Sequence, residues 1–426
     1  MTVVGQGQQH QGRPRSDCDE ASLDAAAAGE GMVPVFQPIV SLPEMTTVGF
    51  EALARWPDLP GCTPDRVFDH ARAIGIVDEL DQLCVAAAIV AALQLPLTRD
   101  TLLSVNAEPS TTYLGRAHNE VLALAHAHLT VMFEITERNP LAHPQTLLRK
   151  VAALRSDGFA VALDDVGAHP DSLALLDVIL PDVIKLDLAL IQTQPSRAQA
   201  RTLAAVLAHC ERTGAVILAE GIESDEHLEQ ALAVGATLGQ GFFFGHPGPL
   251  GQNPTAPWSR SAPRDVPGTD IGSPFDLVAD TSPVRTARKD TLTALSRHIE
   301  SQAAHAADPP MVFTALQRGE YFSGRTRNRY RMLAETCPLV AVFGLGMPAN
   351  VGLGVRGVVL DPADSLCAEW TVVALGPLHA AALIAREHDD SRERPGRDGD
   401  RRFDFVITHD RSLVTAAARS LLERMP

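Results

Sequence analysis

Between residues 33 and 245, short apolar runs of strand-forming residues alternate with longer segments that have helical periodicity. The eight strand candidates are VPVFQPIV (33–40), TTVGFEAL (46–53), LLSVN (102–106), LTVMFEI (129–135), FAVALDD (159–165), DVIKLD (182–187), AVILAE (215–220) and TLGQGFFFG (237–245). The amphipathic segments include 65–95, 144–158, 197–214 and 225–235, and several stop at a glycine, as helix C-termini prefer. This order predicts an α/β fold, a TIM-like (β/α)8 barrel.

The first two strand candidates break the pattern. Only SLPEM (41–45) joins them, which is too short for the crossover helix of a parallel pair. We therefore expect the first strand to be antiparallel, forming a hairpin with the second.

Polar side chains follow one strand candidate after another. They are Glu51, Asn106, Glu134, Asp164, Asp165, Lys185, Glu220 and Gln240. One of them alone would be explained as a helix cap or a solvated strand end. In a barrel the carboxyl ends of the strands converge on one mouth, where so many carboxylates would repel one another. A bound cation, or two, would relieve that repulsion.

The donor types narrow the metal and the chemistry. Carboxylates with one amide oxygen, and no cysteine or histidine, favour Mg²⁺ or Mn²⁺ over Zn²⁺ or copper. Two such ions about 3.5–4 Å apart suit in-line displacement at phosphorus. Phosphodiester hydrolysis is the reaction that this arrangement predicts.

The net charge of −16 argues against a nucleic acid polymer or an anionic membrane as partner, because such binding depends on clustered lysines and arginines. The six cysteines are scattered, with no Cys-x-x-Cys pair, and predict reduced thiols. They are Cys18, Cys62, Cys84, Cys210, Cys337 and Cys367.

No segment of the sequence predicts a membrane span or an export signal. The most apolar stretch, TVVALGPLHAAALIA (371–385), is interrupted by Gly376, Pro377 and His379 and is shorter than the ~20 residues of a spanning helix. We expect a cytoplasmic location.

Eight short motifs in fixed order carry a family resemblance. FQPIV, EALAR, VNAEP, FEITE, LDDVG, IKLD, LAEGIES and LGQGFFFGHP resemble the EAL-domain cyclic di-GMP phosphodiesterases over about residues 33–248. The resemblance implies hydrolysis of cyclic di-GMP to linear pGpG, dependent on two Mg²⁺ or Mn²⁺ ions. It also implies a homodimer formed through the barrel.

Roles transfer from this family position by position. The resemblance makes Glu51, Asn106, Glu134, Asp164 and Asp165 metal ligands, with Asp165 bridging or binding the second ion. It gives substrate contacts to Arg55, which grips a phosphate, and to Gln37, Asp165 and Glu223. The catalytic residues that it implies are Glu51, Lys185, Glu220 and Gln240. Lys185 would hydrogen-bond the attacking water, and Gln240 would lie beside this nucleophile. Glu220 would bind metal or orient the water, with Glu223 supporting it.

Two acidic residues near the site have other interpretations. Glu137 matches a glutamate that fastens the loop after the aspartate pair, although a helix N-terminal role explains it nearly as well. Asp187 is expected to cap the helix that follows it.

The loop after the aspartate pair departs from the family pattern. Many members continue DDFGTGYSSL, whereas this chain has DDVGAHPDSL, with changes at Val166, His169, Pro170 and Asp171. Pro170 stiffens the backbone. The family uses this loop for metal-site order and dimer contact, so the change bears on activity and regulation; His169 is expected to face solvent.

The chain divides into four parts. They are a flexible tail (1–32), the barrel (33–248), a Pro/Gly/Ser-rich linker (249–273) and a smaller α/β domain (274–426). The last part resembles the DICT sensory domain and predicts regulation by an unidentified signal.

Two other functions compete with the hydrolase. A non-catalytic EAL-type receptor would hold cyclic di-GMP without cutting it, but such receptors usually lack some metal ligands, and none is missing here. A purely structural protein leaves the carboxylates at the strand ends unexplained. The enzyme is therefore the preferred prediction.

Overall fold

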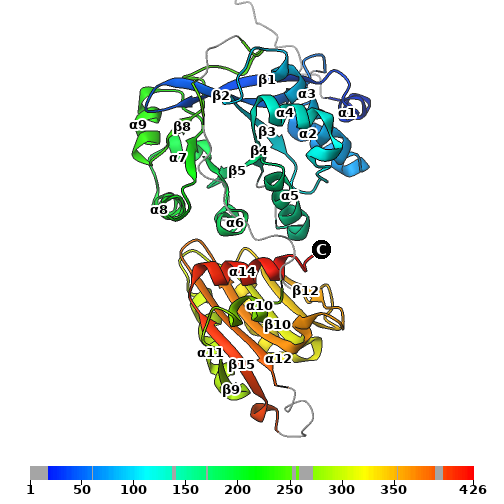
Figure 1. Cartoon of the computed structure of the whole chain (residues 1–426), viewed down its shortest axis with the longest axis vertical. Helices are drawn as coiled ribbons and strands as arrows, with labels where there is room; N and C mark the ends of the chain where they lie inside the picture. Colours follow the sequence, from blue (N-terminus) through cyan, green and yellow to red (C-terminus); the bar gives the residue numbers. More distant parts are fainter. Residues whose placement is uncertain are drawn as a thin grey trace, which may run out of the picture.

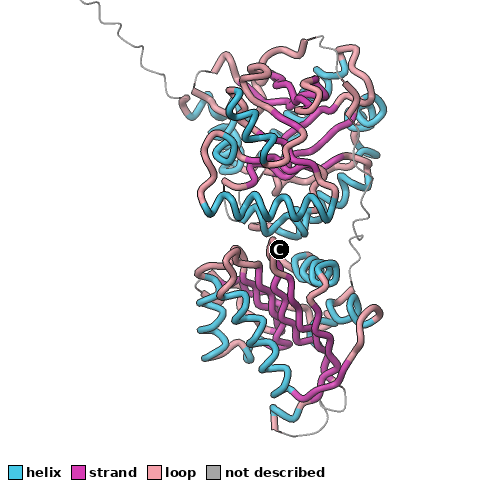
Figure 2. Tube along the Cα trace, turned by 90° about the vertical axis from the view of Figure 1, so that its left-hand side faces the viewer, coloured by secondary structure: helices cyan, strands magenta, loops and turns pink. Residues whose placement is uncertain are grey.

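The computed structural model describes residues 18–59, 61–136, 141–168, 171–251, 256–258, 272–352, 354–388 and 397–426. The chain forms two bodies stacked along its long axis, a barrel and a sheet domain (Figures 1 and 2). Within the described residues, no helix has both the length and the apolar composition needed to cross a membrane.

The first body is a closed barrel of eight strands in sequence order. Its strands are β1 (Val33–Ser41), β2 (Thr46–Arg55), β3 (Leu102–Ala107), β4 (Thr130–Ile135), β5 (Ala160–Val166), β6 (Val183–Leu186), β7 (Val216–Ala219) and β8 (Leu238–Gly239). β1 is antiparallel to both β2 and β8, and the other neighbours are parallel. The predicted fold class and the antiparallel first strand are confirmed.

Helices cover the outside of the barrel. They are α1 (Glu20–Ala27), α2 (Pro64–Ile74), α3 (Val77–Leu93), α4 (Glu120–His128), α5 (Pro144–Ser156), α6 (Asp171–Ile179), α7 (Leu188–Ile191), α8 (Arg197–Thr213) and α9 (Asp225–Ala233), with a 3-10 turn at Arg116–His118. The predicted 65–95 segment is two helices, because Gly75 adopts a left-handed conformation that ends α2. Asp187 caps α7 as expected, since its side chain accepts a hydrogen bond from the Ala189 amide.

The N-terminal boundary differs from the prediction. Residues 18–32 were expected in a flexible tail, but they include α1, which packs on α2 with a 2.7 Å contact between Asp24 and His70. The expectation of reduced cysteines is wrong for Cys18 and Cys62, which form a disulfide between this segment and the loop before α2. Residues 1–17 lie outside the described residues.

Part of the predicted linker is also attached to the barrel. The Ala256 amide donates to the Thr47 carbonyl at 2.8 Å, and the Trp258 amide donates to the Asp100 carbonyl at 2.9 Å. The chain therefore returns along the amino ends of the barrel strands before it enters the second domain.

The second body is a seven-stranded sheet in the order β12-β11-β10-β13-β14-β15-β9. Its strands are β9 (Arg285–Arg288), β10 (Met311–Arg318), β11 (Val340–Leu345), β12 (Val355–Val359), β13 (Glu369–Leu375), β14 (Ala380–Glu387) and β15 (Arg402–Thr408). Its helices are α10 (Pro274–Ala279), α11 (Lys289–Ala304), α12 (Gly324–Ala334) and α14 (Arg411–Leu422), with 3-10 turns at Gly319–Tyr321, Ser365–Ala368 and Asp398–Asp400.

Both faces of this sheet are covered. Alternate residues of β10 enter different apolar clusters: Met311 and Phe313 join the cluster that includes α14, whereas Val312 joins the one that includes α11 and α12. Because strand side chains alternate between faces, α14 and α11 lie on opposite sides of the sheet. The face with α14 is the one turned toward the barrel (Figure 1).

Candidate functional site

A polar layer crosses the barrel directly above an apolar layer. The apolar layer consists of Ile39, Val48, Leu102, Met132, Ala160, Ala162, Val183, Leu218 and Leu238. Two positions along the strands, on the same inward face, stand Gln37, Ser104, Glu134, Asp164, Lys185, Glu220 and Gln240. The period of two in a strand thus places six of the predicted polar residues, together with Ser104, above an apolar barrel floor.

Lys185 is at the centre of this layer and is 1% exposed. Its ammonium nitrogen lies 2.7 Å from Glu134 Oε2, 2.8 Å from Asp164 Oδ1 and 2.9 Å from Glu220 Oε1, and Glu51 Oε1 is 3.7 Å away. One buried cation therefore faces four carboxylates. Lys185 alone would not neutralise all four groups if each were ionised.

Glu51 joins this cluster to the barrel's closing strands. Gln240 Nε2 donates to Glu51 Oε2 at 2.6 Å and lies 3.1 Å from Gln37 Oε1, while Asn106 Nδ2 donates to Glu51 Oε1 at 3.2 Å. Gln37 Nε2 donates in turn to the Gly245 carbonyl at 3.2 Å. These amides fix the orientation of the Glu51 carboxylate.

The loop after Gln240 depends on a glycine. A Cβ on Gly241 would lie 2.0 Å from the Ile222 carbonyl oxygen, and its φ of +155° is one that other residues rarely adopt. Only glycine lets this loop approach the β7–α9 connection so closely.

The aspartate pair occupies an irregular end of β5. Pairing between β5 and β6 shifts register between Leu163 and Val166, and Asp165 has a left-handed φ of 52°. Aspartate is one of the few residues other than glycine that visit this region. The local distortion brings oxygens of Asp164, Asp165 and Glu220 within 4.8 Å of one another.

Proton affinities in the cluster follow from burial and crowding. Burial and the neighbouring Glu51 raise the pKa of Glu134 well above its usual value. Burial raises the pKa of Glu220 to about 8 against the attraction of Lys185, and burial with the adjacent Asp164 raises that of Asp165 to about 6.

Glu51 and Lys185, in contrast, favour their ionised forms. Burial opposes ionisation of both groups, but Lys185 and the Gln240 amide lower the pKa of Glu51, while Asp164 and Glu134 raise that of Lys185. The site therefore keeps its lysine charged and holds protons on carboxyls that a divalent cation would ionise.

The donor set fits a hard divalent cation. Asp164, Asp165 and Glu220 offer three converging carboxylate oxygens. Asn106, on β3, carries an amide oxygen and lines the same cavity as Asp164 and Asp165. Buried Gln240 Oε1 and Thr136 Oγ1 have no hydrogen-bond partner among the described residues. Hard oxygens without sulfur or imidazole are what Mg²⁺ and Mn²⁺ prefer.

A cavity of about 440 Å³ opens over this layer. Glu51, Asn106, Asp164 and Asp165 line its floor, and Arg55 lines its wall. The Arg55 guanidinium donates to the Ala54 carbonyl at 2.9 Å. The cavity therefore brings a cationic side chain and carboxylates to the same space.

Not every predicted site residue joins the cluster. The Glu223 side chain is exposed, and its backbone amide donates to His227 Nδ1 at 3.2 Å. Glu137, His169 and Pro170 lie outside the described residues, and nothing is described of the Asp171 side chain.

Two residues of the site were not predicted. Ser104, fully buried, donates to Glu134 Oε1 at 2.5 Å, and Thr136 lines the cavity. Ser104 lies two positions before Asn106, and Thr136 two after Glu134, so the strand period could have identified both.

The fold and site define a (β/α) barrel protein whose mouth carries a lysine-centred carboxylate cluster suited to divalent cations. Residues 20–247 match the EAL domain family, and the chain belongs to that family. Residues 277–388 match the DICT domain, described as a sensory domain in diguanylate cyclases and two-component systems. The resemblance stated from the motifs is confirmed for both domains.

Several known proteins are similar to the barrel half. The cyclic di-GMP phosphodiesterase RocR of Pseudomonas aeruginosa is 32% identical over 226 residues, covering 50% of this chain and 57% of RocR. The probable cyclic di-GMP phosphodiesterase PdeG of Escherichia coli is 28% identical over 242 residues, covering 55% of this chain and 48% of PdeG. The chain thus spans about half the length of these relatives.

Among solved structures, the manganese and cyclic di-GMP complex of Klebsiella pneumoniae BlrP1 at pH 6 is 30% identical, with a TM-score of 0.44. The match covers 52% of this chain and 56% of that one.

Proposed function

We propose that this protein hydrolyses cyclic di-GMP to linear pGpG with two bound Mg²⁺ or Mn²⁺ ions. The observation that carries the proposal is the buried Lys185 among four carboxylates beneath an open cavity. Membership of the EAL family and the names of RocR and PdeG support the substrate.

In this proposal Glu51, Asn106, Glu134, Asp164 and Asp165 hold the cations. When bound, the cations neutralise the phosphate charge and ease the ionisation of water at neutral pH. Ser104, Gln240 and Asn106 orient the carboxylates through the hydrogen bonds described above.

The remaining roles concern the substrate and the attacking water. Lys185 Nζ donates a hydrogen bond to the water that attacks phosphorus, and Glu220 binds a cation or orients this water. Arg55, at the cavity wall, binds a non-reacting phosphate oxygen. Gln37 positions Gln240 through their 3.1 Å contact, and the assignment of Glu223 as a supporting residue requires movement of its exposed side chain.

The experiment is incubation of the full chain with cyclic di-GMP and Mg²⁺ or Mn²⁺, followed by separation of the products. We expect pGpG to accumulate, chelator to stop the reaction, and Mg²⁺ or Mn²⁺ to restore it. Ca²⁺ should inhibit, because its larger radius and looser coordination disturb the in-line geometry. Hydrolysis that continues in excess chelator would rule out the two-metal mechanism.

Binding without any product would instead identify a receptor. Glu51→Ala is the matched variant, because Glu51 touches Asn106, Gln240 and Lys185 at once. It should lose cation binding and turnover together, whereas a receptor that needs no metal would keep its nucleotide affinity.

A further inference from the structure

Helix α6 is buried at every position from Ser172 to Ile179, which is unusual for a helix on the outside of a barrel. A surface helix normally has one apolar stripe, and a helix that is apolar all round needs a second partner. In the sequence DSLALLDVI, six of the eight positions from Ser172 to Ile179 are apolar. The barrel covers one side of α6, and α14 of the second domain packs against it as well (Figure 1).

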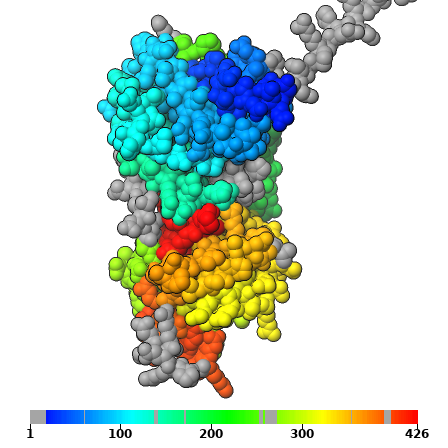
Figure 3. Space-filling view, turned by 90° about the vertical axis from the view of Figure 1, so that its right-hand side faces the viewer, coloured from blue at the N-terminus to red at the C-terminus, as the bar shows by residue number. Residues whose placement is uncertain are grey.

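The apolar core is continuous across this contact. One cluster includes Leu175 and Leu176 of α6 together with Val414 and Leu421 of α14. In the space-filling view α14 lies between the barrel and the rest of the second domain (Figure 3). The two domains therefore share apolar packing where α14 meets α6.

Two arginines of α14 hold the C-terminal half of α6. Arg411 forms an ion pair with Asp177, which also accepts from Arg212 at 3.1 Å and lies 3.2 Å from His209. Buried Arg419 donates to the Val178 carbonyl at 2.8 Å. The last carbonyls of a helix lack partners within it, so this contact completes the helix end from another domain.

Helix α6 follows the aspartate pair with only residues 166–170 between them. The left-handed Asp165 and the register shift at β5 are local distortions that the surrounding structure must maintain. A change in the position or order of α6 would therefore be felt first at Asp164 and Asp165.

We propose that α14 is a positioning element for the aspartate pair, acting through α6, so that the second domain sets the cation affinity of the barrel. The proposal rests on the proposed function for its catalytic consequence. Its two states are α14 docked on α6 and α14 displaced. A signal acts by favouring one state, since Arg411 and Arg419 contact α6 only when α14 is docked.

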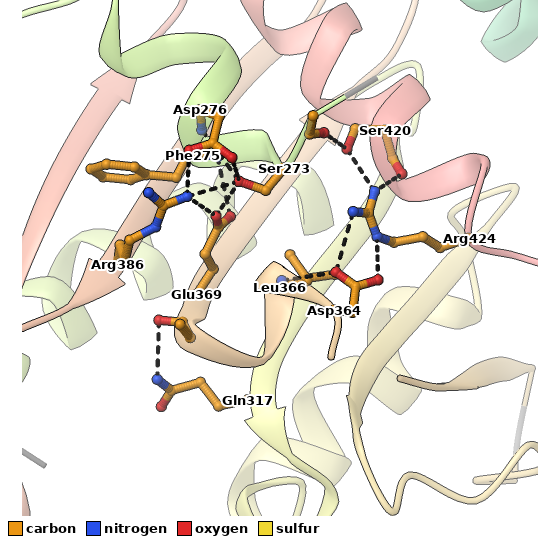
Figure 4. A network of polar contacts seen from close by, with 12 residues as sticks. Ser273, Phe275, Asp276, Gln317, Asp364, Leu366, Glu369, Arg386, Ser420 and Arg424 are labelled. Atoms are coloured by element: carbon orange, nitrogen blue, oxygen red, sulfur yellow. Dashed lines mark hydrogen bonds and ion pairs between the residues drawn. The ribbon is translucent and has the colours of Figure 1, made fainter. Parts of the chain in front are cut away.

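The second domain can transmit such a displacement because α14 is fastened to it (Figure 4). Ser420 Oγ donates to the Gly272 carbonyl at 2.8 Å, and Arg424 forms a two-point ion pair with Asp364 at 2.8 and 3.2 Å.

A second network holds α10 to the sheet beside α14. Buried Glu369 on β13 accepts from the Phe275 amide at 3.1 Å and from Arg386 at 2.8 Å, and Arg386 also pairs with Asp276. Because α10 packs on α14, these contacts join the end of the linker, α14 and the sheet. A rearrangement of the sheet domain would carry α14 with it.

The test uses the full chain carrying Arg411→Ala and Arg419→Ala together. Hydrogen exchange of residues 171–179 should accelerate at least tenfold, and the dissociation constant for Mn²⁺ alone should rise at least threefold. The variant with Arg411→Lys and Arg419→Lys keeps both charges. Its exchange rate and its dissociation constant for Mn²⁺ should both lie between those of the double alanine variant and those of the native chain.

Two controls separate this route from general loss of charge. Arg212→Ala removes a partner of Asp177 from within the barrel, and Arg288→Ala removes a surface ion pair with Asp400 at the far edge of the second domain. Both should stay within twofold of the native chain in both measurements.

Unchanged exchange in α6, or faster exchange with unchanged Mn²⁺ affinity, would overturn the proposal, and so would equal effects in the controls. If the double alanine variant does not fold, the lysine variant decides by the same criteria. Absence of cyclic di-GMP hydrolysis by the native chain would refute the proposed function but would leave these two measurements valid.

Discussion

Lys185 carries a positive charge in a place where most barrels would bury an apolar side chain. Its contacts with Glu134 and Asp164, each shorter than 3 Å, make it the internal counter-ion of the site. Removal of one partner from such a buried group leaves uncompensated charge. Lys185 therefore supports the folded state as well as the proposed chemistry.

We predict that Lys185→Ala keeps cyclic di-GMP binding but lowers the hydrolysis rate by about 10²–10⁴-fold, because the lysine acts on water in the transition state. In chelator, the free energy of unfolding should also fall by about 3–5 kcal/mol. Calorimetry, a rate assay and urea unfolding measure the three effects. A loss of nucleotide affinity with an unchanged rate would contradict the role.

The pH dependence of stability follows from Glu220 and Asp165. Their pKa values in the folded protein are about 8 and about 6, against 4.5 and 3.8 for the free groups. Between these values the folded chain binds more protons than the unfolded chain, so the free energy of unfolding falls as pH rises.

In chelator, we therefore expect the melting temperature to fall from pH 5 to pH 8. Mn²⁺ should flatten this profile, since the cation compensates the ionised carboxylates. Glu220→Gln is the control, and its profile should be flatter than the native one because Glu220 no longer titrates. An equally steep profile for that variant would assign the effect to other groups.

At the scale of elements, the barrel was predictable because each strand is short, apolar and bounded by polar ends. The strands of the second domain were harder to predict from the sequence. The stretch 371–385 was considered as one apolar segment when a membrane span was excluded; the structure divides it into β13 and β14, with residues 376–379 in the turn between them. β9, with the sequence RTAR, has no apolar alternation, because it is an edge strand with exposed side chains.

In the site, too, some features could be predicted from the sequence and others could not. Residues at strand ends follow from local periodicity, so Glu51, Glu134 and Lys185 were found from the sequence. The exposure of Glu223 depends on the path of a loop, and the Cys18–Cys62 bond depends on packing between segments 44 residues apart. Neither is encoded by local spacing.

Helix α1 provides an element-scale prediction. The Cys18–Cys62 disulfide closes a loop over α1 and the first two strands, and bonds of this kind typically contribute about 2–4 kcal/mol. Reduction should lower the melting temperature, and Cys18→Ser should show the lower value without reductant. Cys84→Ser is the control for loss of a free thiol, with no response expected. Mass measurement after alkylation that finds both cysteines free in unreduced protein would contradict the bond.

At the scale of the whole molecule, the second domain covers an apolar side of the barrel. A chain of residues 1–250 would expose the face of α6 that α14 covers. We expect this shorter chain to self-associate, because large apolar patches on a free surface promote association. Light scattering at matched concentrations compares it with the full chain, and equal behaviour of the two would contradict the prediction.

The expected homodimer through the barrel stays a prediction. In the full chain, the outer side of α6 is already occupied by α14, so a barrel dimer would need another surface or a displaced second domain. Mass measurements of the full chain with and without Mn²⁺ distinguish these arrangements.

The contact between α6 and α14 also sets an order of events during synthesis. The two helices are about 230 residues apart in the sequence. At 5–20 residues per second, a ribosome needs roughly 12–46 s to add that length. Until α14 emerges, the side of α6 that it covers stays open beside the aspartate pair, and we expect chaperones to bind this apolar side in the nascent chain.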